Sequence, residues 1–331
     1  MAIIASPPRA PQAAVPGSLR HLPVNLFASV MGLSGLALAW RLAQPAFGAP
    51  ELIAELVGAL ALLVFLLLAM VYGLKLLRHR EAVWAEFRHP VSGSFFGTIV
   101  ISLLLLSAVL APYGAAFSQA LWALGTLATF GLSLIVVARL LKGGGEPAHA
   151  VPAWLIPGVA TLDIVVTGAT MPMAWAVEVN LAALAVGTVL ALLLFALIFA
   201  RLVQQEPLAV AMRPSLMILV APFAVGFLAY TQLFGMVDRF AALLFYFGLF
   251  VFVLVAAQVF RRDVPFTPNW WGIGFPIAAL SNAALKYAAV QQSRPLLWLA
   301  AALLALLTLA IAVLSLRTLQ LLVNGKLLVA R

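Results

Sequence analysis

The sequence predicts an all-α integral membrane protein in which ten transmembrane helices form five helical hairpins around a central pore. Three observations lead to this fold class: the composition, the spacing of the apolar runs and the distribution of basic residues. Of the 331 residues, 65% are hydrophobic and only 9% are charged, and the mean hydropathy is +1.14. A soluble domain is about one-quarter charged, so the composition indicates a membrane protein.

Apolar runs separated by turn residues or charges divide the chain into segments of membrane-spanning length. A helix needs about 20 predominantly apolar residues to cross a bilayer, and the chain has room for about ten such helices with short loops, but for no sizeable soluble domain. We expect helices at residues 24–41, 51–77, 92–111, 115–141, 152–170, 174–202, 212–233, 239–260, 268–290 and 294–321.

These helices define one transmembrane domain over residues 24–322, flanked by two short tails. The first 23 residues are rich in proline and lack a continuous apolar core of signal-peptide length. We therefore expect residues 1–23 to be a disordered cytoplasmic tail. Residues 323–331 are expected to form a short cytoplasmic C-terminal tail.

The basic residues support an even number of spans. With the N-terminus placed in the cytoplasm, fifteen of the 19 Lys and Arg residues fall in cytoplasmic segments. The four on the outer side are Arg41, Arg239, Lys286 and Arg294. Cytoplasmic loops of membrane proteins are enriched in Lys and Arg, so this distribution predicts that both termini are cytoplasmic. It also accounts for the net charge of +9 without nucleic-acid binding, which we do not expect.

Odd-numbered and even-numbered helices differ in their small and kinking residues. The even helices contain no internal proline, whereas each odd helix carries glycine, proline or both. Such residues allow close helix packing or line a cavity, so we expect the odd helices inside and the even helices outside. For any single glycine, helix packing alone is the simpler explanation. The residues concerned in the first four odd helices are Gly32, Gly35, Gly93, Gly97, Pro157, Gly158, Pro222 and Gly226.

The segment 268–290 is the most unusual of the ten. Gly272 and Gly274 precede the pair Phe275–Pro276. Proline removes a backbone donor and clashes with the preceding turn, so we expect a kink near Phe275. Freed backbone groups in a membrane must be buried in protein or face a water-filled cavity. The segment is therefore expected to line the pore, with Phe275 as a hydrophobic gate; ordinary aromatic packing is the alternative.

Two ionisable residues within predicted spans are candidates for function. Asp163 is the acidic residue expected deepest in the membrane, where such a group is costly and often functional. Proton coupling and a structural hydrogen bond between helices are both open for it. Lys286 lies near the outer end of its helix and is expected to reach the interface. Attraction of anions to the outer mouth and pairing with Asp163 are the alternatives.

Hydroxyl side chains recur at helical spacing on two of the odd helices. Ser94 and Thr98 begin one series, and Asp163 is followed by Thr167 and Thr170 in another. Such stripes can hydrate a pore. Ser and Thr can equally bond to carbonyl groups of their own helix.

Enzyme chemistry has no positive support in the sequence. Cysteine is absent, which excludes disulfides, thiolate nucleophiles and cysteine metal sites. All four histidines lie outside the predicted spans or at a helix start, so a haem or metal centre within the membrane is not expected. We expect neither enzymatic activity nor a cofactor.

Four motifs resemble one family of transport proteins, the tellurite-resistance/C4-dicarboxylate transporter family of TehA, which is related to the plant guard-cell slow anion channels. The most specific motif reads WWGIGFPIAALSNAALKYA (Trp270–Ala288). The others read FASVMGLSGLALAWR (Phe27–Arg41), HPVSGSFF (His89–Phe96) and RPSLMILVAPFAVGFLAY (Arg213–Tyr230). These motifs are markers of a resemblance that runs over nearly all ten spans.

The resemblance implies a homotrimer of ten-helix protomers, each with its own pore closed by a phenylalanine, which corresponds to Phe275. It also implies transport of small anions such as chloride, nitrate or malate without nucleotide hydrolysis. We do not expect this chain to carry the long regulatory tails of the plant channels. Asp163 does not match a shared anion-selecting residue of the family.

The leading functional prediction is an anion channel or channel-like transporter in a bacterial inner membrane, in contact with membrane lipid. The alternative is a proton-coupled C4-dicarboxylate carrier that uses Asp163 and confers a tellurite-resistance phenotype. A membrane-embedded enzyme or a scaffold that transports nothing is a third class. Anion flux through reconstituted protein distinguishes them.

Overall fold

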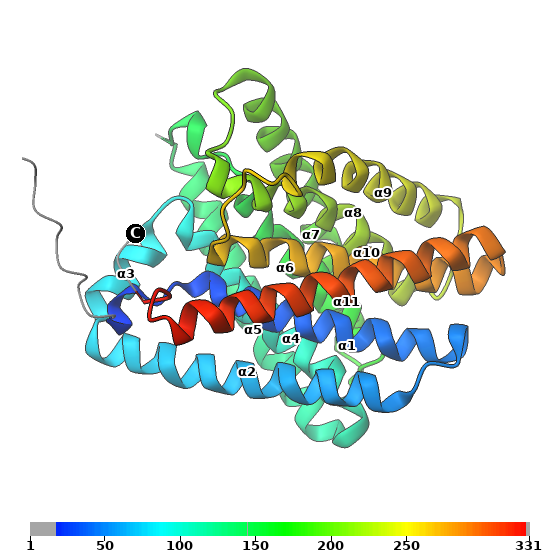
Figure 1. Cartoon of the computed structure of the whole chain (residues 1–331). Helices are drawn as coiled ribbons and strands as arrows, with labels where there is room; N and C mark the ends of the chain where they lie inside the picture. The colour runs from blue at the N-terminus through cyan, green and yellow to red at the C-terminus, as the bar shows by residue number, and fades with distance from the viewer. Residues whose placement is uncertain (1–17, 144, 329–331) are drawn as a thin grey trace, which may run out of the picture.

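The computed structural model describes residues 18–143 and 145–328, and within these residues it is all-helical. Residues 1–17 of the expected N-terminal tail and residues 329–331 of the expected C-terminal tail lie outside the described residues. The α-helices of the described part, shown in Figure 1, are α1 (Ala28–Phe47), α2 (Glu51–Arg78), α3 (Arg80–Arg88), α4 (Gly97–Leu110), α5 (Ala115–Leu141), α6 (Leu155–Gly168), α7 (Ala176–Gln204), α8 (Ala221–Phe234), α9 (Arg239–Val259), α10 (Gly274–Gln291) and α11 (Arg294–Val323).

Nine helices in this described part are long and apolar enough to cross a membrane. They match nine of the ten ranges expected from the sequence. The remaining range corresponds to Pro152–Gly168, an apolar helix of shorter length. Two details differ from expectation. The first helix does not end at Arg41 but continues through Pro45 to Phe47, and the short charged helix α3 was not expected.

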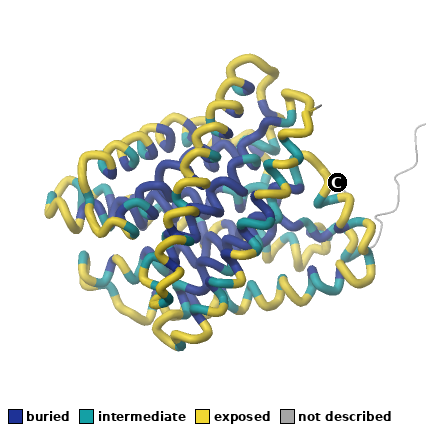
Figure 2. Tube along the Cα trace, turned by 180° about the vertical axis from the view of Figure 1, so that it is seen from behind, coloured by how far each residue is buried: buried dark blue, intermediate teal, exposed yellow. Residues whose placement is uncertain are grey.

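Helices α1, α4, α6, α8 and α10 are the inner helices, and each packs against its neighbours in a closed ring that follows the order of the chain. Each is followed by an outer helix that packs on it: α2, α5, α7, α9 and α11. Figure 2 shows the buried residues concentrated along the middle of the bundle and the exposed ones around it. In the four inner helices of full span length, 61–83% of residues are buried, compared with 17–39% in the outer five.

Each inner helix begins with a 3₁₀ segment before it becomes α-helical. In three of these helices a proline lies where the 3₁₀ segment becomes α-helical. Pro157, Pro222 and Pro276 all lie within the first three residues of their α-helices. The N–H groups of a first helical turn have no partner within the helix, so proline loses little there. The 3₁₀ segments are Val24–Phe27, Ser92–Phe96, Pro152–Trp154, Val210–Val220 and Pro268–Ile273.

The two ends of the described chain meet at one end of the bundle, which we call the terminal face. There the amide of Ser18 donates a hydrogen bond to the carbonyl of Leu328 at 3.1 Å. Figure 1 shows the first and last segments side by side at that end. We call the opposite end the far face. Because both ends of the described chain lie at the terminal face, this described part crosses the length of the bundle an even number of times.

A buried ion pair fixes the segment that leads into α1. Lys75 donates to Glu86 at 2.6 Å and to the carbonyl of Leu22 at 2.7 Å. Glu86 also accepts from the amide of Val24 at 2.8 Å and from the hydroxyl of Tyr72 at 2.9 Å. A buried charge is stable only when it is paired and hydrogen-bonded. These contacts therefore hold the beginning of α1 against α2 and α3.

Candidate functional site

Two cavities lie within the ring of inner helices, and one residue lines both of them. The far cavity has a volume of about 370 Å³ and is lined by residues toward the far face. The near cavity has a volume of about 30 Å³ and lies on the other side, toward the terminal face. Among the described residues, Phe275 is the one that lines both cavities. Its side chain is buried, with the residue 7% exposed, so it does not face the outer surface of the bundle.

The near cavity is narrow and almost wholly apolar. Its volume is close to that of a single water molecule in the liquid, roughly 30 Å³. Such a site gives water few polar partners, so it favours the dry state. Besides Phe275, its wall contains Ala28, Met31, Phe95, Thr98, Ile101, Ile156, Val159, Ile218, Ala221, Trp271, Gly272 and Pro276.

The far cavity is larger and contains polar and charged side chains from four of the five inner helices, α1, α6, α8 and α10. Arg41 and Lys286 contribute positive charge, and Asp163 contributes a carboxyl group. Asn282 and Gln232 add side-chain amides to the wall. A volume of this size holds roughly ten water molecules at their liquid density. The volume of the far cavity is therefore large enough to hold a small anion together with several water molecules, whereas that of the near cavity is not.

The two cations of the far cavity have neutral partners. Arg41 donates to the carbonyls of Ala108 and Val109, at 3.2 and 2.7 Å, near the C-terminus of α4. Lys286 donates to the side-chain oxygen of Gln232 at 2.8 Å. A cation bound to neutral acceptors keeps its full charge. Both residues therefore make the far cavity attractive to anions.

Asp163 lies in the wall of the far cavity without a polar partner on one of its oxygens. The residue is 1% exposed, and its Oδ2 is buried without a hydrogen bond among the described residues. The pairing with Lys286 that the sequence left open is not formed, since no ion pair within 4.0 Å joins these two residues in the described structure. The carboxyl group and the ammonium group therefore share one cavity without neutralising each other.

Two of the hydroxyl groups predicted to hydrate a pore, those of Thr98 and Thr167, are bonded to backbone, whereas Thr170 lines the far cavity without such a bond among the described residues. Thr98 lines the near cavity, but its hydroxyl donates to the carbonyl of Phe95 at 2.6 Å. Thr167 donates in the same way to the carbonyl of Asp163 at 2.8 Å. Ser94 lines neither cavity within the ring and lies instead in the wall of a third cavity near the terminal face.

The glycine and proline residues predicted for the inner helices divide into those that line a cavity, a pair that packs between α1 and α10, and those that line neither cavity. Gly35 lines the far cavity, and Gly272 and Pro276 line the near cavity. Gly32 and Gly274 lie against each other where α1 meets α10, with a Cβ on Gly32 placed 3.5 Å from Gly274 Cα. The other members are away from both cavities: Pro157, Gly158, Pro222, Gly226, Gly93 and Gly97.

Several lining residues were not singled out from the sequence. Arg41 was expected at the outer end of the first helix without a role, yet it lines the far cavity. Asn282 was also given no role; it donates to the carbonyls of Gly35 and Ala278 at 3.0 and 2.8 Å. The residues of the apolar wall of the near cavity could not be identified from the sequence, because apolar side chains such as isoleucine and methionine are common in membrane spans. The described residues contain no cluster of His, Asp and Glu suited to a metal ion.

The fold and these cavities define a helical membrane protein whose inner helices enclose a larger polar cavity and a small apolar one. Residues 21–319 match the SLAC1 family, described as voltage-dependent anion channel. Because the match covers most of the sequence, the chain belongs to this family of anion channels, which are not enzymes.

Curated relatives support the same assignment. The chain is 26% identical over 284 residues to the S-type anion channel SLAH3 of Arabidopsis thaliana, covering 83% of this chain and 44% of the relative. It is 28% identical to the guard cell S-type anion channel SLAC1 of the same plant, over 82% of this chain and 50% of the relative. It is 25% identical to the tellurite resistance protein TehA homolog of Haemophilus influenzae, over 80% of this chain and 81% of the relative. The chain thus spans about half the length of the plant relatives.

Proposed function

We propose that the protein is an anion channel, or channel-like transporter, whose path runs between the five inner helices and is closed by Phe275. The observation that carries this proposal is the position of Phe275 between the far and near cavities. The proposal takes Pro152–Gly168 as the tenth span, because this apolar helix completes the ring and is buried along nearly its whole length. The ten spans then form five hairpins around the path.

The proposed orientation places both termini in the cytoplasm of a bacterial cell, with the channel in the inner membrane. The contact between Ser18 and Leu328 at one end of the bundle supports a common side for the termini. The excess of Lys and Arg among the segments at that end assigns this side to the cytoplasm. The far cavity then opens toward the outside.

In this mechanism the far cavity collects anions and the near cavity blocks them. Arg41 and Lys286 raise the local concentration of small anions such as chloride and nitrate. The apolar near cavity offers an ion nothing to replace its hydration shell, so the closed state does not conduct. Movement of the Phe275 ring would join the cavities and let water enter. Selectivity then depends on the positive potential and on the ease of dehydration rather than on a tight binding site.

The test is anion flux into liposomes that contain purified protein. Replacing Phe275 by Ala is expected to give a large, persistent flux of chloride and nitrate. Malate flux is measured in the same way as that of the other two anions. Phe275→Leu should give a smaller increase, because more of the constriction remains filled. Phe250→Ala is the matched control, since Phe250 lies on the outer surface of α9 and is 61% exposed. Equal flux through wild type and Phe275→Ala, at equal reconstituted amounts, would contradict the gate.

A proton-coupled C4-dicarboxylate carrier is the second candidate. It is favoured by the buried, partly unpartnered carboxyl group of Asp163 in the far cavity. A carrier predicts that a malate gradient drives protons across the membrane and that Asp163→Asn abolishes this movement. A channel predicts electrogenic flux down the gradient with no coupled protons. A tellurite-resistance phenotype would be compatible with either.

We also propose that the protein assembles as a homotrimer with one path in each protomer. The outer helices present a wide apolar surface that both lipid and neighbouring protomers can cover, including Leu127 and Leu134 of α5, which are 74% and 71% exposed. Native mass spectrometry of detergent-extracted protein tests the number of chains. A predominantly monomeric species in mild detergents would overturn this part of the proposal.

A further inference from the structure

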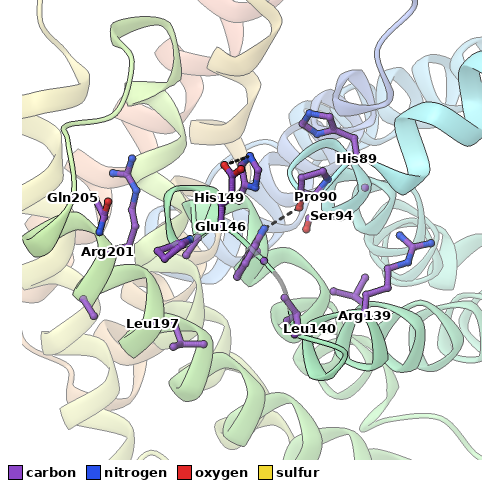
Figure 3. A pocket seen from close by; sticks show the side chains of 18 of the residues that line it. His89, Pro90, Ser94, Arg139, Leu140, Glu146, His149, Leu197, Arg201 and Gln205 are labelled. Carbon is purple, nitrogen blue, oxygen red and sulfur yellow. Dashed lines mark hydrogen bonds and ion pairs between the residues drawn. The ribbon is translucent and has the colours of Figure 1, made fainter.

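A third cavity lies at the terminal face, away from the proposed conduction path. This lateral cavity has a volume of about 710 Å³ and shares no lining residue with the near or far cavity. Its walls come from the ends of α3, α5 and α7 and from the segments that lead into α4 and α6. In Figure 3, Arg201 and Gln205 stand at one edge, Arg139 stands at the other, and Glu146 and His149 lie between them.

The charged groups of the lateral cavity are predominantly basic. Arg88, Arg139 and Arg201 come from three different helices. Glu146 is the acidic residue of the described wall, and its carboxylate lies 3.8 Å from the imidazole of His149. Three guanidinium groups against one carboxylate give the cavity a positive potential, which favours an anionic occupant.

Two of the three arginines already have partners in the protein. Arg139 donates to the carbonyl of Phe87 at 2.7 Å, and its guanidinium lies 4.2 Å from the centre of the Phe87 ring. Arg88 lies 5.7 Å from the ring of Trp84. These contacts hold both side chains in place at the wall of the cavity.

Arg201 differs from the other two. The residue is only 9% exposed, and its Nε and Nη1 are buried without a hydrogen-bond partner among the described residues. Its position in the last turn of α7 compensates the helix dipole, but this role requires no cavity and leaves the buried donors unpaired. Buried polar groups in proteins nearly always have a partner, and a buried unpaired charge is costly. An anion in the lateral cavity would supply what Arg201 lacks.

We propose that the lateral cavity is a binding site for a phosphate group, with Arg201 as its principal contact and Arg139 and Arg88 providing the surrounding positive charge. The planar guanidinium group presents parallel N–H donors that match phosphate oxygens. The volume exceeds that of a free phosphate ion, so a phosphate-bearing organic molecule or a phospholipid headgroup also fits this chemistry. The site goes beyond the proposed conduction path and requires no transport activity.

The lateral cavity lies against segments that continue into the near cavity. Ser94 lines the lateral cavity, and the next residue in the chain, Phe95, lines the near cavity. Trp154 lines the lateral cavity and donates to the carbonyl of Pro90 at 2.9 Å, which joins the starts of α4 and α6. A phosphate bound to Arg201 would therefore lie in a cavity lined by the same two segments that continue into the wall of the near cavity.

Binding can be measured by thermal unfolding of the purified protein. Sodium phosphate is titrated at constant ionic strength against sodium chloride, and in a second arm nanodiscs with and without phosphatidic acid are compared. Wild type is expected to be stabilised in at least one arm. Arg201→Gln should weaken the apparent affinity by about tenfold or more, as expected for loss of a charge-assisted hydrogen bond. Stabilisation by phosphate alone indicates a free ligand, and stabilisation by phosphatidic acid alone indicates a lipid.

Two further variants make the outcome decisive. Gln205→Glu changes an exposed residue of the cavity wall and introduces a negative charge, so it should weaken binding even if Arg201→Gln fails to fold. Arg262→Gln removes an exposed arginine outside the cavity and should leave the affinity unchanged. Absence of stabilisation in both arms, or equal affinities of wild type, Arg201→Gln and Gln205→Glu, would overturn the proposal.

Discussion

Gly35 of α1 and Ala278 of α10 lie so close together that a Cβ atom on Gly35 would be 2.6 Å from the Cβ of Ala278. Carbon atoms of this kind normally stay about 3.5–4.0 Å apart. The contact holds α1 against α10 one helical turn beyond Phe275, and both residues line the far cavity. Close approach at this point therefore helps to set the position of the proposed gate.

The first prediction concerns this contact. Gly35→Ala should destabilise the protein by about 1–3 kcal/mol, as overpacking of a tight interior does, and should raise anion leak because α10 is displaced. Adding Ala278→Gly removes the opposing methyl group and should recover much of the loss. Gly73→Ala is the control, since no atom lies within 4 Å of a Cβ placed there. Thermal unfolding measures the stability and liposome flux measures the leak. A Gly35→Ala protein with the stability and the anion leak of wild type would contradict the close contact.

The second prediction concerns the charge of the far cavity. Lys286→Gln should lower anion flux several-fold in a Phe275→Ala background at low salt, because it removes a positive charge beside the path. The effect should shrink as ionic strength rises toward about 1 M, where the Debye length is roughly 3 Å. Arg294→Gln provides the control, since Arg294 is exposed and lies outside the far cavity. A loss of flux independent of salt would argue against electrostatic attraction.

The third prediction concerns the buried ion pair between α2 and α3. Glu86→Ala should destabilise the protein by about 3–5 kcal/mol, because it leaves the buried Lys75 ammonium without its partner. Glu81→Ala, in the same helix but with its side chain 62% exposed, should change stability by no more than about 0.5 kcal/mol. Thermal unfolding of the two variants compares them directly. Similar melting temperatures would show that the pair is not needed to fix the segment before α1.

The fourth prediction concerns the pH dependence of the loop before α9. Asp238 caps this helix by accepting from the amide of Ala241 at 2.9 Å. The amide of Ala241, with the hydroxyl of Tyr230, holds the pKa of Asp238 below its ordinary value of 3.8. A carboxyl group with a lowered pKa stabilises the fold above its ordinary pKa, and this contribution is lost as pH falls through the folded value.

Melting temperatures measured between pH 7 and pH 3 test this contribution. Wild type should lose stability on acidification, and Asp238→Asn should lose less, since it keeps a capping oxygen but has no proton to gain. At pH 7, Asp238→Ala should be less stable than wild type. Parallel acid profiles for wild type and Asp238→Asn would mean that another group is responsible.

The sequence predicted the arrangement of the helices because a membrane restricts the length and the composition of the segments that cross it. Length and apolarity mark the spans, and nine of the ten expected ranges reappear as helices of spanning length in the described residues. The alternation of glycine and proline predicted which helices are buried. Gly35 illustrates the reason: only a residue without a side chain permits the observed approach of α1 and α10.

The details of the site depend on tertiary contacts that no local pattern carries. The sequence placed residues 268–290 in one helix and did not predict that Pro268–Ile273 forms a 3₁₀ segment. Arg41 was expected at the end of the first helix, but that it lines the far cavity depends on how α1 packs against its neighbours. The partner of Lys286 proved to be Gln232, a residue 54 positions away in the chain. The lateral cavity joins the ends of three helices and could not be read from any one of them.

The last prediction separates the two functional candidates at Asp163. An ionised carboxylate buried beside an anion path without a counter-ion would be costly and would repel the ions that pass. We therefore expect the side chain to be held as the neutral acid in a channel. Asp163→Asn replaces it by a neutral group of the same shape, so anion flux in the Phe275→Ala background should stay within about twofold of its value. Liposome flux is the measurement, with intraliposomal pH recorded at the same time. Loss of malate-driven acidification together with loss of malate transport in Asp163→Asn would instead establish a proton-coupled carrier.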